Sequence, residues 1–423
     1  MKDTPSENPK IPAAYTYFGQ FVSHDITLIP KNLTNKTWIA KDQSPYMDLD
    51  SVYGKSSGEA TVPFFAEDKD LFLIGKNTLG EADLPRNTSS QAMIADPRND
   101  MSIMIAQMHL MFLNLHNRLV HTLRENDFKG NIFQEARRIA SWHYQWVIVH
   151  DYLKKLVGEE LLYSKISRNH KAKARLSLTY LKNKKFYYLP LEFIGAAYRM
   201  GHSMIRSHYY LNKIPNARNP RTGRAESRAI QIFDYSSGYR DLKGNRSLPP
   251  YHSLQWNLFL NFGQAQRPQG SHCIDTYLAG PMRHVQDEAG NEQSMAERNL
   301  IRGQDFELPS GQSLAKEMGI EALAKLHPKQ ETPLWYYILQ EAELQHQGQQ
   351  LGLLGGNLIL EVFLAKLKQD KSSYLHKTGG WSPEQEGIIP FAGKQFELKD
   401  LVSFAGMPIS QTDIDKIFTN NHL

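Results

Sequence analysis

Two long stretches with helical spacing of apolar residues constrain the fold of this chain more than any other feature. Residues 101–125 carry isoleucine, leucine, methionine and phenylalanine at mixed intervals of three and four, and residues 133–157 form a second such stretch. Mixed spacing of this kind is typical of a helix that is buried on more than one side. The pattern therefore predicts long buried helices and favours a mainly α fold.

The rest of the chain fits that fold class. We expect further helices over residues 15–28, 191–212, 292–302, 311–326, 333–346 and 354–369, a loop at Gly379 and Gly380, and a terminal helix after Ser410. Strand-like alternation is scarce, with residues 187–189 and 229–233 as the best short candidates. Residues 29–100 are rich in glycine, proline, asparagine and aspartate, which predicts a long irregular segment of the kind that often carries function.

The domain organisation is less clear from length alone. A chain of 423 residues ordinarily contains roughly two or three domains. No internal boundary has the composition of a linker, however, and the sequence has no internal repeat. We therefore predict one large helical domain over residues 1–423.

Composition excludes several classes of site and partner. The single cysteine, Cys273, cannot form an intramolecular disulfide or a cysteine-based zinc or iron–sulfur site. The net charge of +5 is a weak bias for this length and does not predict a nucleic-acid partner. No stretch approaches ~18 uncharged apolar residues and the N-terminus has no signal-peptide core, so we expect a cytoplasmic protein without a membrane span. The oligomeric state stays open.

The first candidate site lies in the expected helix over residues 15–28. Gln20 and His24 are four residues apart, so both side chains lie on one helix face. A neutral imidazole beside an amide can move a proton on a small ligand and orient that ligand. Taken alone, His24 is more often a capped, partly buried histidine.

Two further clusters follow. Ser44, Tyr46, Asp48 and Asp50 place oxygen atoms at alternate positions, which suits a hard cation such as calcium, although a solvated acidic loop is the commoner structure. Arg98 follows Asp96 and Pro97 just before the first long helix. Its fixed charge can stabilise charge that develops on a nearby oxygen, and the alternative is an ordinary loop salt bridge.

The last two clusters lie in later helices. His202 has small residues before it in an otherwise apolar helix, which leaves room for a flat group such as haem, and a satisfied core histidine is the alternative. Asn299 stands between Arg298 and Arg302. An asparagine oxygen can accept the second ring N–H of a metal-bound histidine, although this segment alone is an ordinary polar helix.

Taken in order, these five clusters resemble the animal-type haem peroxidases of the peroxidase–cyclooxygenase superfamily. The resemblance covers about residues 15–370 and implies one helical domain with haem between a distal and a proximal helix. It implies that Gln20 and His24 lie above the haem, where His24 takes a proton from hydrogen peroxide and returns it to the leaving oxygen. It also implies that Arg98 polarises the O–O bond.

The resemblance also implies how the cofactor is held. His202 is the expected iron ligand, Asn299 the acceptor for its second ring N–H, Arg199 a partner for a haem propionate, and Arg302 an arginine at the haem edge. His116, on the first long helix, is expected to be structural.

The same resemblance implies a calcium ion that holds the distal helix in place. Its expected ligands are Asp25, Ser44, Tyr46 through its carbonyl, Asp48 and Asp50.

Two departures from the family pattern bear on the cofactor. The positions whose carboxylates form ester bonds to the haem in mammalian members hold Ser23 and Met101 here. Neither side chain can form such an ester, so we predict a non-covalently held haem b and do not expect strong halide oxidation.

The expected function is a haem peroxidase that reduces hydrogen peroxide and oxidises small organic electron donors. The first alternative is a haem-dependent fatty-acid dioxygenase, which needs a radical-forming tyrosine three residues before the proximal histidine. That position holds Arg199, and Tyr198 lies one residue further back, where a helical step of ~100° turns the side chain away. The second alternative is a non-catalytic haem- or calcium-binding protein.

Overall fold

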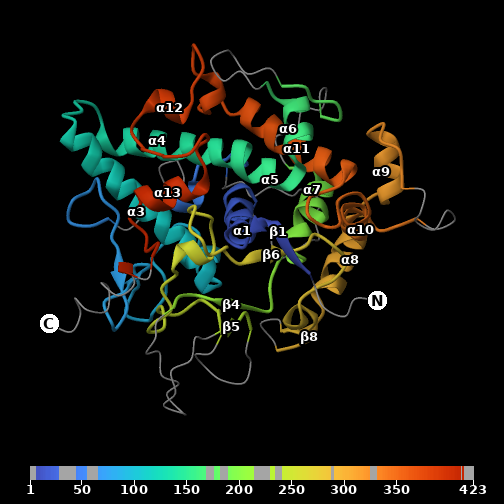
Figure 1. Ribbon diagram of the computed structural model, residues 1–423, viewed down its shortest axis with the longest axis horizontal. Helices are drawn as coiled ribbons and strands as arrows, with labels where there is room; N and C mark the ends of the chain where they lie inside the picture. Colours follow the sequence, from blue (N-terminus) through green and yellow to red (C-terminus); the bar gives the residue numbers. More distant parts are fainter. Residues whose placement is uncertain are drawn as a thin grey trace.

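The computed structural model describes residues 6–27, 44–54, 65–167, 176–181, 189–213, 229–233, 241–286, 290–323, 331–410 and 412–413. Helices make up most of its regular structure, and the strands form short two-stranded pairs (Figure 1). The predicted mainly α fold is confirmed.

The centre of the molecule is built from three helices, α1 (Ala14–Ile26), α3 (Ile103–Glu125) and α4 (Ile132–Val147). Helix α3 packs against both of the others. Phe21 of α1 stacks on Phe112 of α3 at 4.6 Å between ring centroids, and Phe112 meets Tyr144 of α4 edge-on at 5.5 Å. The mixed apolar spacing of α3 is explained by these two partners, because both of its apolar sides are covered.

The second predicted long helix contains an irregularity. Helix α4 continues into a π-helix, η2 (Ile148–Leu153), and then into α5 (Lys154–Val157). A π-helix widens the turn by one residue, which apolar spacing alone does not reveal. This segment carries Tyr152, whose hydroxyl lies against Gly19 of α1 so closely that a Cβ there would be 2.3 Å from it.

The prediction of one helix over residues 191–212 is wrong. The segment forms α7 (Leu191–Gly195), a 3-10 helix η3 (Ala197–His202) and a strand β4 (His208–Tyr210) that pairs with β5 (Ala229–Gln231). The break falls at Ala196, whose φ of −136° and ψ of −66° are not helical. The break follows Gly195, the last residue of α7, which packs so closely that a Cβ there would lie 2.7 Å from the Phe306 ring.

The later helices follow the predictions more closely. They are α8 (Met295–Asp305), α9 (Gly311–Glu317), α10 (Leu334–His346) and α11 (Leu353–Gln369). Helix α9 is shorter than predicted, because Gly319 has a φ of +68° and ends the helical path. Gly379 and Gly380 both have a φ of +83°, which confirms the predicted loop. The predicted terminal helix after Ser410 and residues 187–188 lie largely outside the described residues.

The remaining elements are short. Strand β1 (Glu7–Pro12), which the sequence did not suggest, pairs with β6 (Gly270–His272), whereas the predicted strand at 229–233 is present as β5. The other elements are α2 (Asp50–Tyr53), β2 (Gly75–Lys76), β3 (Ala82–Asp83), η1 (Pro97–Asp100), α6 (Glu159–Lys165), η4 (Trp256–Leu258), η5 (Gly280–Arg283), β7 (Val285–Gln286), β8 (Glu292–Gln293), η6 (Tyr374–His376), α12 (Pro383–Glu386) and α13 (Leu398–Phe404).

Buried apolar side chains from Ile11 to Met407 form one continuous cluster. That a single domain spans the whole chain stays a prediction. Among the helices that the structure describes, none combines the length and the apolar character that a membrane crossing requires.

Candidate functional site

The distal candidate residues gather where the end of α1 meets η1. Nδ1 of His24 lies 2.9 Å from Oδ1 of Asn99, and Nδ2 of Asn99 lies 3.0 Å from Nδ1 of His109 on α3. All three side chains are buried. One asparagine amide therefore bridges two histidines that come from different helices.

Arg98, the residue before that asparagine, ties η1 to the end of α1. Its Nη1 and Nη2 donate to the backbone carbonyls of Thr27 and His24 at 2.6 Å each, and its guanidinium pairs with Asp96 at 2.6 Å. Carbonyls at a helix C-terminus lack partners within the helix, so a cation here stabilises α1. The structure thus places Arg98 next to His24, and its hydrogen bond there is with the backbone carbonyl of His24.

Burial and this charge control ionisation in the distal cluster. Burial lowers the pKa of His24 to about 4, and the charge of Arg98 contributes to the shift. Burial likewise lowers the pKa of His109 to about 4. Burial opposes the ionisation of Asp96, but the Arg98 guanidinium holds the pKa of that carboxyl below its ordinary value. Both histidines are therefore neutral at pH 7.

Gln20 lies one helical turn before His24 on α1 and is half-buried. Among the residues that the structure describes, none forms a hydrogen bond with its amide. The adjacent Gly19, by contrast, packs directly against the Tyr152 side chain. Gln20 can therefore offer its amide to a ligand.

The proximal candidate, His202, ends the 3-10 helix η3, which packs against α1. Nδ1 of His202 lies 2.9 Å from Nδ2 of Asn299 on α8. The buried Oδ1 of Asn299 has no hydrogen-bond partner within the described part of the chain. A half-turn of this amide would place Oδ1 on Nδ1 of His202, and within the described part of the chain His202 alone selects between the two orientations.

The 3-10 geometry also places Arg199. Residues three apart eclipse each other in a 3-10 helix, so Arg199 and His202 lie on one side of η3. Burial, together with the like charge of Arg302 on α8, lowers the pKa of Arg199 to about 10. Neither arginine forms an ion pair with a carboxylate among the described residues. Two neighbouring arginines without an acid are the donor set that an anionic group requires.

The space beside His202 is open. A Cβ placed on Gly201, the residue before His202, would meet no atom within 4 Å. Burial lowers the pKa of His202 to about 3, and the charge of Arg199 adds to this effect. The imidazole is therefore neutral at pH 7, as a metal ligand must be.

Tyr198 points away from this side of η3. Its hydroxyl donates to that of Tyr152 at 3.2 Å, and its ring stacks on Phe193 at 4.9 Å between centroids. Burial raises the pKa of Tyr198 well above the ordinary tyrosine value. The side chain is thus held in the core, between η3, α7 and η2.

The residues expected to bind calcium form a buried acidic cluster. Oδ1 and Oδ2 of Asp25 accept the backbone N–H groups of Ser51 and Leu49 at 3.1 Å each. Burial raises the pKa of Asp25 to about 7, and the charge of Asp50 contributes. Burial also raises the pKa of Asp48 well above its ordinary value, with contributions from both other carboxylates.

Among the described residues, Arg137 brings a positive charge to this acidic cluster. Arg137 of α4 approaches Oδ1 of Asp50 at 3.3 Å. Oγ of Ser44 accepts the backbone N–H of Tyr46 at 3.2 Å, so both lie in the same turn. No group of three metal-ligating side chains in metal-holding geometry is present among the described residues.

His116 occupies a different environment from the candidate histidines. Its Nδ1 lies 3.0 Å from the Tyr53 hydroxyl, and its Nε2 lies 2.9 Å from the Asp70 carbonyl. Its ring also contacts Phe72 and Phe133. Both ring nitrogens serve the packing of α3, which agrees with the structural role expected for this residue.

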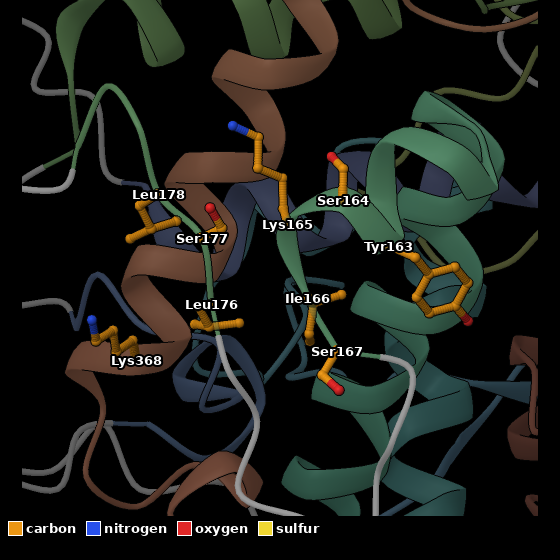
Figure 2. Close-up of a pocket in the computed structure, with 9 residues that line it drawn as sticks. All are labelled: Tyr163, Ser164, Lys165, Ile166, Ser167, Leu176, Ser177, Leu178 and Lys368. Atoms are coloured by element: carbon orange, nitrogen blue, oxygen red, sulfur yellow. The ribbon is translucent and has the colours of Figure 1, made fainter.

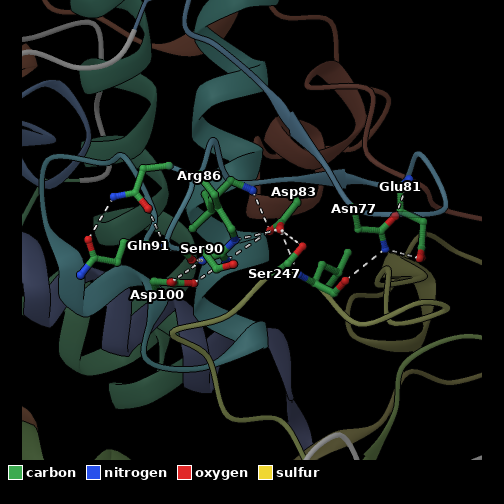
Figure 3. A network of polar contacts seen from close by, with 11 residues as sticks. Asn77, Glu81, Asp83, Arg86, Ser90, Gln91, Asp100 and Ser247 are labelled. Carbon is green, nitrogen blue, oxygen red and sulfur yellow. Dashed lines mark hydrogen bonds and ion pairs between the residues drawn. The ribbon is translucent and has the colours of Figure 1, made fainter.

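Three residues of the distal cluster were not singled out from the sequence. No local sequence pattern marks Asn99 and His109. They are ten residues apart in the chain, and the contact that joins them also includes His24 on α1. Asp100 accepts two hydrogen bonds from the Arg86 guanidinium at 2.7 and 2.8 Å, and Arg86 also pairs with Asp83 at 2.9 Å (Figure 3). This buried ion pair holds η1 in place.

A surface groove of about 430 Å³ lies next to α6, with Lys165, Ser177 and Lys368 among the residues that line it (Figure 2). None of the candidate site residues lines this groove. The groove is therefore separate from the candidate site around His24 and His202.

Fold and site together define a mainly helical protein with two histidine–asparagine pairs on neighbouring elements. The model of the animal haem peroxidase family matches residues 39–327, more than half of the chain. The chain therefore belongs to the animal haem peroxidase family, as predicted. The matched range includes Arg98, His202 and Asn299. It begins after α1, so the assignment of Gln20 and His24 rests on geometry and on the resemblance of their motif.

Individual relatives are distant. Peroxidase mlt-7 of Caenorhabditis elegans is 32% identical over 117 residues, which cover 27% of this chain and 15% of that relative. This chain thus matches only a small part of the length of that curated relative.

Solved structures show the same fold at low identity. Peroxidase A from Dictyostelium discoideum aligns with a TM-score of 0.62 at 14% identity, covering 97% of this chain and 87% of that chain. The fatty acid alpha-dioxygenase of Oryza sativa aligns with a TM-score of 0.61 at 12% identity, over 99% of this chain and 77% of that chain. The enzyme of the same name from Arabidopsis thaliana gives 0.58 at 14% identity, over 99% and 73%. These similarities establish the fold class.

Proposed function

We propose that this protein is a haem peroxidase that reduces hydrogen peroxide and oxidises small organic electron donors. The observation that carries the proposal is the pair of neutral histidines on packed elements, His24 on α1 and His202 on η3, each with an asparagine at Nδ1. An iron ligand and a proton acceptor are the two imidazole functions that this chemistry requires.

The proximal residues fit a haem. His202 would bind the iron through Nε2, and the half-turn of Asn299 would supply the acceptor for the proton on Nδ1. Arg199 and Arg302 would pair with the propionates, since they are neighbouring arginines without a carboxylate partner in the described chain. When bound, the haem supplies the redox-active iron that peroxide oxidises.

The distal residues would handle the proton. Nδ1 of His24 is held by Asn99, so Nε2 takes the proton from the near oxygen of peroxide and returns it to the departing oxygen. Gln20 would orient the peroxide with its half-buried amide. The charge of Arg98, beside His24, would stabilise negative charge on the departing oxygen.

We further propose that the haem is b-type and non-covalent. Ser23 and Met101 occupy the two ester positions of mammalian relatives, and Met101 is 54% exposed at the end of η1. Extraction with acidified acetone should release the haem from denatured protein. Haem that stays with the polypeptide would contradict this part of the proposal.

We also propose that calcium binds among Asp25, Asp48 and Asp50, with oxygen atoms of Ser44 and Tyr46 completing its ligands. The support is that burial and mutual repulsion disfavour three ionised carboxylates unless a cation joins them. Added calcium should raise the midpoint of thermal unfolding, and Asp48→Asn should abolish the response. An equal calcium response in Asp48→Asn would contradict the assignment.

The peroxidase proposal is tested with haem-loaded protein, hydrogen peroxide and a phenolic donor. We expect turnover in the wild type and a loss of about 10²- to 10⁴-fold in His24→Leu, the usual contribution of a general acid–base group. His116→Leu is the matched control, because it removes a buried histidine of α3 outside the site. Equal turnover in His24→Leu and the wild type would show that His24 is not the proton acceptor.

The dioxygenase alternative has a separate readout. It predicts oxygen uptake with a polyunsaturated fatty acid that Tyr198→Phe abolishes. We expect no such uptake, since Tyr198 bonds to Tyr152 in the core and Arg199 shares the side of η3 with His202.

A further inference from the structure

The Asn99 amide joins two histidines with different hydrogen-bonding needs. An amide oxygen only accepts a hydrogen bond and an amide nitrogen only donates, so each end of the side chain dictates what its partner must do. Oδ1 faces Nδ1 of His24 at 2.9 Å, and Nδ2 faces Nδ1 of His109 at 3.0 Å. In this arrangement Nδ1 of His24 must carry a proton and Nδ1 of His109 must not.

We propose that Asn99 and His109 are positioning residues that set the tautomer of His24 and thereby leave its Nε2 as the proton acceptor. Neutral histidine in water prefers the proton on Nε2, so the protein has to reverse this preference. The inference rests on the proposed function, because it assigns the residues that prepare His24 for its role in that reaction.

His109 is needed because an asparagine alone can turn its amide. His109 is fully buried and its Nδ1 is the acceptor that retains Nδ2 of Asn99. Nε2 of His109 is buried and has no hydrogen-bond partner among the described residues, so Asn99 is the polar group that fixes the ring. A half-turn of Asn99 would demand a simultaneous change of tautomer in both histidines, which couples the two.

The bridge also suits both states of the proton acceptor. Nδ1 of His24 carries a proton in the neutral state required here and in the imidazolium state that follows. Oδ1 of Asn99 can therefore accept the same hydrogen bond before and after the proton arrives. No side chain has to turn during the proton transfer, which is the geometric requirement for efficient acid–base catalysis.

The residue that follows Asn99, Asp100, is held by contacts outside the site, including the Arg86 ion pair (Figure 3). Asp100 binds the Arg86 guanidinium at 2.7 and 2.8 Å, and its carbonyl accepts the N–H of Asn245 at 2.6 Å. Gly244 lies so close that a Cβ there would overlap the Asp100 carbonyl oxygen. The turn that carries Asn99 is thus held by contacts independent of His24.

The tautomers can be read without haem. Full-length protein labelled with ¹⁵N-histidine is examined by NMR at pH 7, with signals assigned through His24→Leu and His109→Leu. Protonated and unprotonated ring nitrogens differ widely in ¹⁵N shift. We expect the proton on Nδ1 of His24 and on Nε2 of His109. The reverse pair of tautomers would overturn the proposal.

The consequence for reactivity is measured on haem-loaded protein as the rate constants for peroxide and for cyanide, which also gives up a proton when it binds. Asn99→Leu should lower both by about 10- to 100-fold, in the range of an outer-sphere partner. Asn99→Asp keeps an acceptor for His24 and should restore most of the rate. His109→Leu should reproduce the loss, and His109→Gln, which offers an acceptor to Nδ2, should rescue it.

The matched control is His116→Leu, which removes a buried histidine from the same helix without touching Asn99. It should leave both rate constants unchanged. Wild-type rates in Asn99→Leu, with His24→Leu impaired, would refute the inference alone. A wild type without turnover would refute the proposed function, while the NMR result would still decide the tautomers.

Discussion

The two histidine–asparagine pairs use the same residue types but differ in what holds the amide. On the distal side, both polar atoms of Asn99 are engaged, one by His24 and one by His109. On the proximal side, Nδ2 of Asn299 faces His202 and Oδ1 has no partner in the described chain. The distal amide is held by a second histidine, whereas among the described residues the proximal amide is oriented by His202 alone. Both proposed roles need a proton on Nδ1 of the histidine and an amide oxygen that accepts it.

The largest expected effect breaks the proximal half. His202→Gly should abolish the absorption spectrum of histidine-ligated haem, because the iron loses its protein ligand. Added imidazole should restore it, since the space beside Gly201 is open. The measurement is a haem titration followed in the Soret region, with His116→Leu as the control. A normal spectrum in His202→Gly would place the iron ligand elsewhere.

The next effect comes from removing Arg86, whose ion pairs hold the segment that carries Asn99. Arg86→Ala should cost about 3–5 kcal/mol of unfolding free energy, because it leaves Asp83 and Asp100 buried without their cation. Arg124→Ala is the matched control, since Arg124 also pairs with two aspartates but is 35% exposed, against 9% for Arg86. That control should cost at most about 1 kcal/mol. Urea unfolding measures both, and equal losses would contradict the special role of the buried pair.

A smaller effect is the pH dependence of stability that His109 of the distal side contributes. Burial lowers the pKa of His109 to about 4 from an unfolded value near 6.5. The unfolded chain therefore binds the proton first, so the contribution of His109 is complete above pH 6.5 and is lost as the pH falls towards 4. The loss is on the order of 3 kcal/mol. Unfolding free energies at a series of pH values should show a shallower decline in His109→Leu, and an unchanged slope would contradict the shift.

The smallest effect distinguishes the roles of the two asparagines. Asn299→Leu should weaken haem affinity by about 10- to 100-fold, because the ligating histidine loses its acceptor. Asn99→Leu should leave haem affinity unchanged and slow the reaction with peroxide. Haem titration and stopped-flow mixing separate the two readouts. If both variants changed the same quantity, the division of labour between the two amides would be wrong.

The helices could be predicted where the sequence pattern is long. Apolar spacing located α1, α3, α8, α10 and α11 closely, because burial on a helix repeats every three or four residues. It failed over residues 191–212, where the helix ends at Gly195 against Phe306 and β4 pairs with β5, and it missed β1, whose partner β6 is far away in the sequence. Neither cause is local, so no window of sequence contains it.

The candidate site likewise has residues that the sequence indicated and residues that only long-range contacts bring together. The order of His24, Arg98, His202 and Asn299 in the chain indicated the family, and the structure brings His24 to Arg98 and His202 to Asn299. The catalytic and ligand-binding roles of these residues stay predictions. Asn99 and His109 were missed because a buried bridge between three segments has no spacing of its own.

By itself, the sequence determined that this chain is mainly helical and belongs among the haem peroxidases. Helical periodicity and the order of the site residues are properties of the linear sequence and can be read without the fold. Only the tertiary structure decided which atoms face one another. It brings Asn99 between two histidines and leaves Oδ1 of Asn299 without a partner among the residues that the structure describes, since packing in three dimensions determines the hydrogen-bond partners of buried groups.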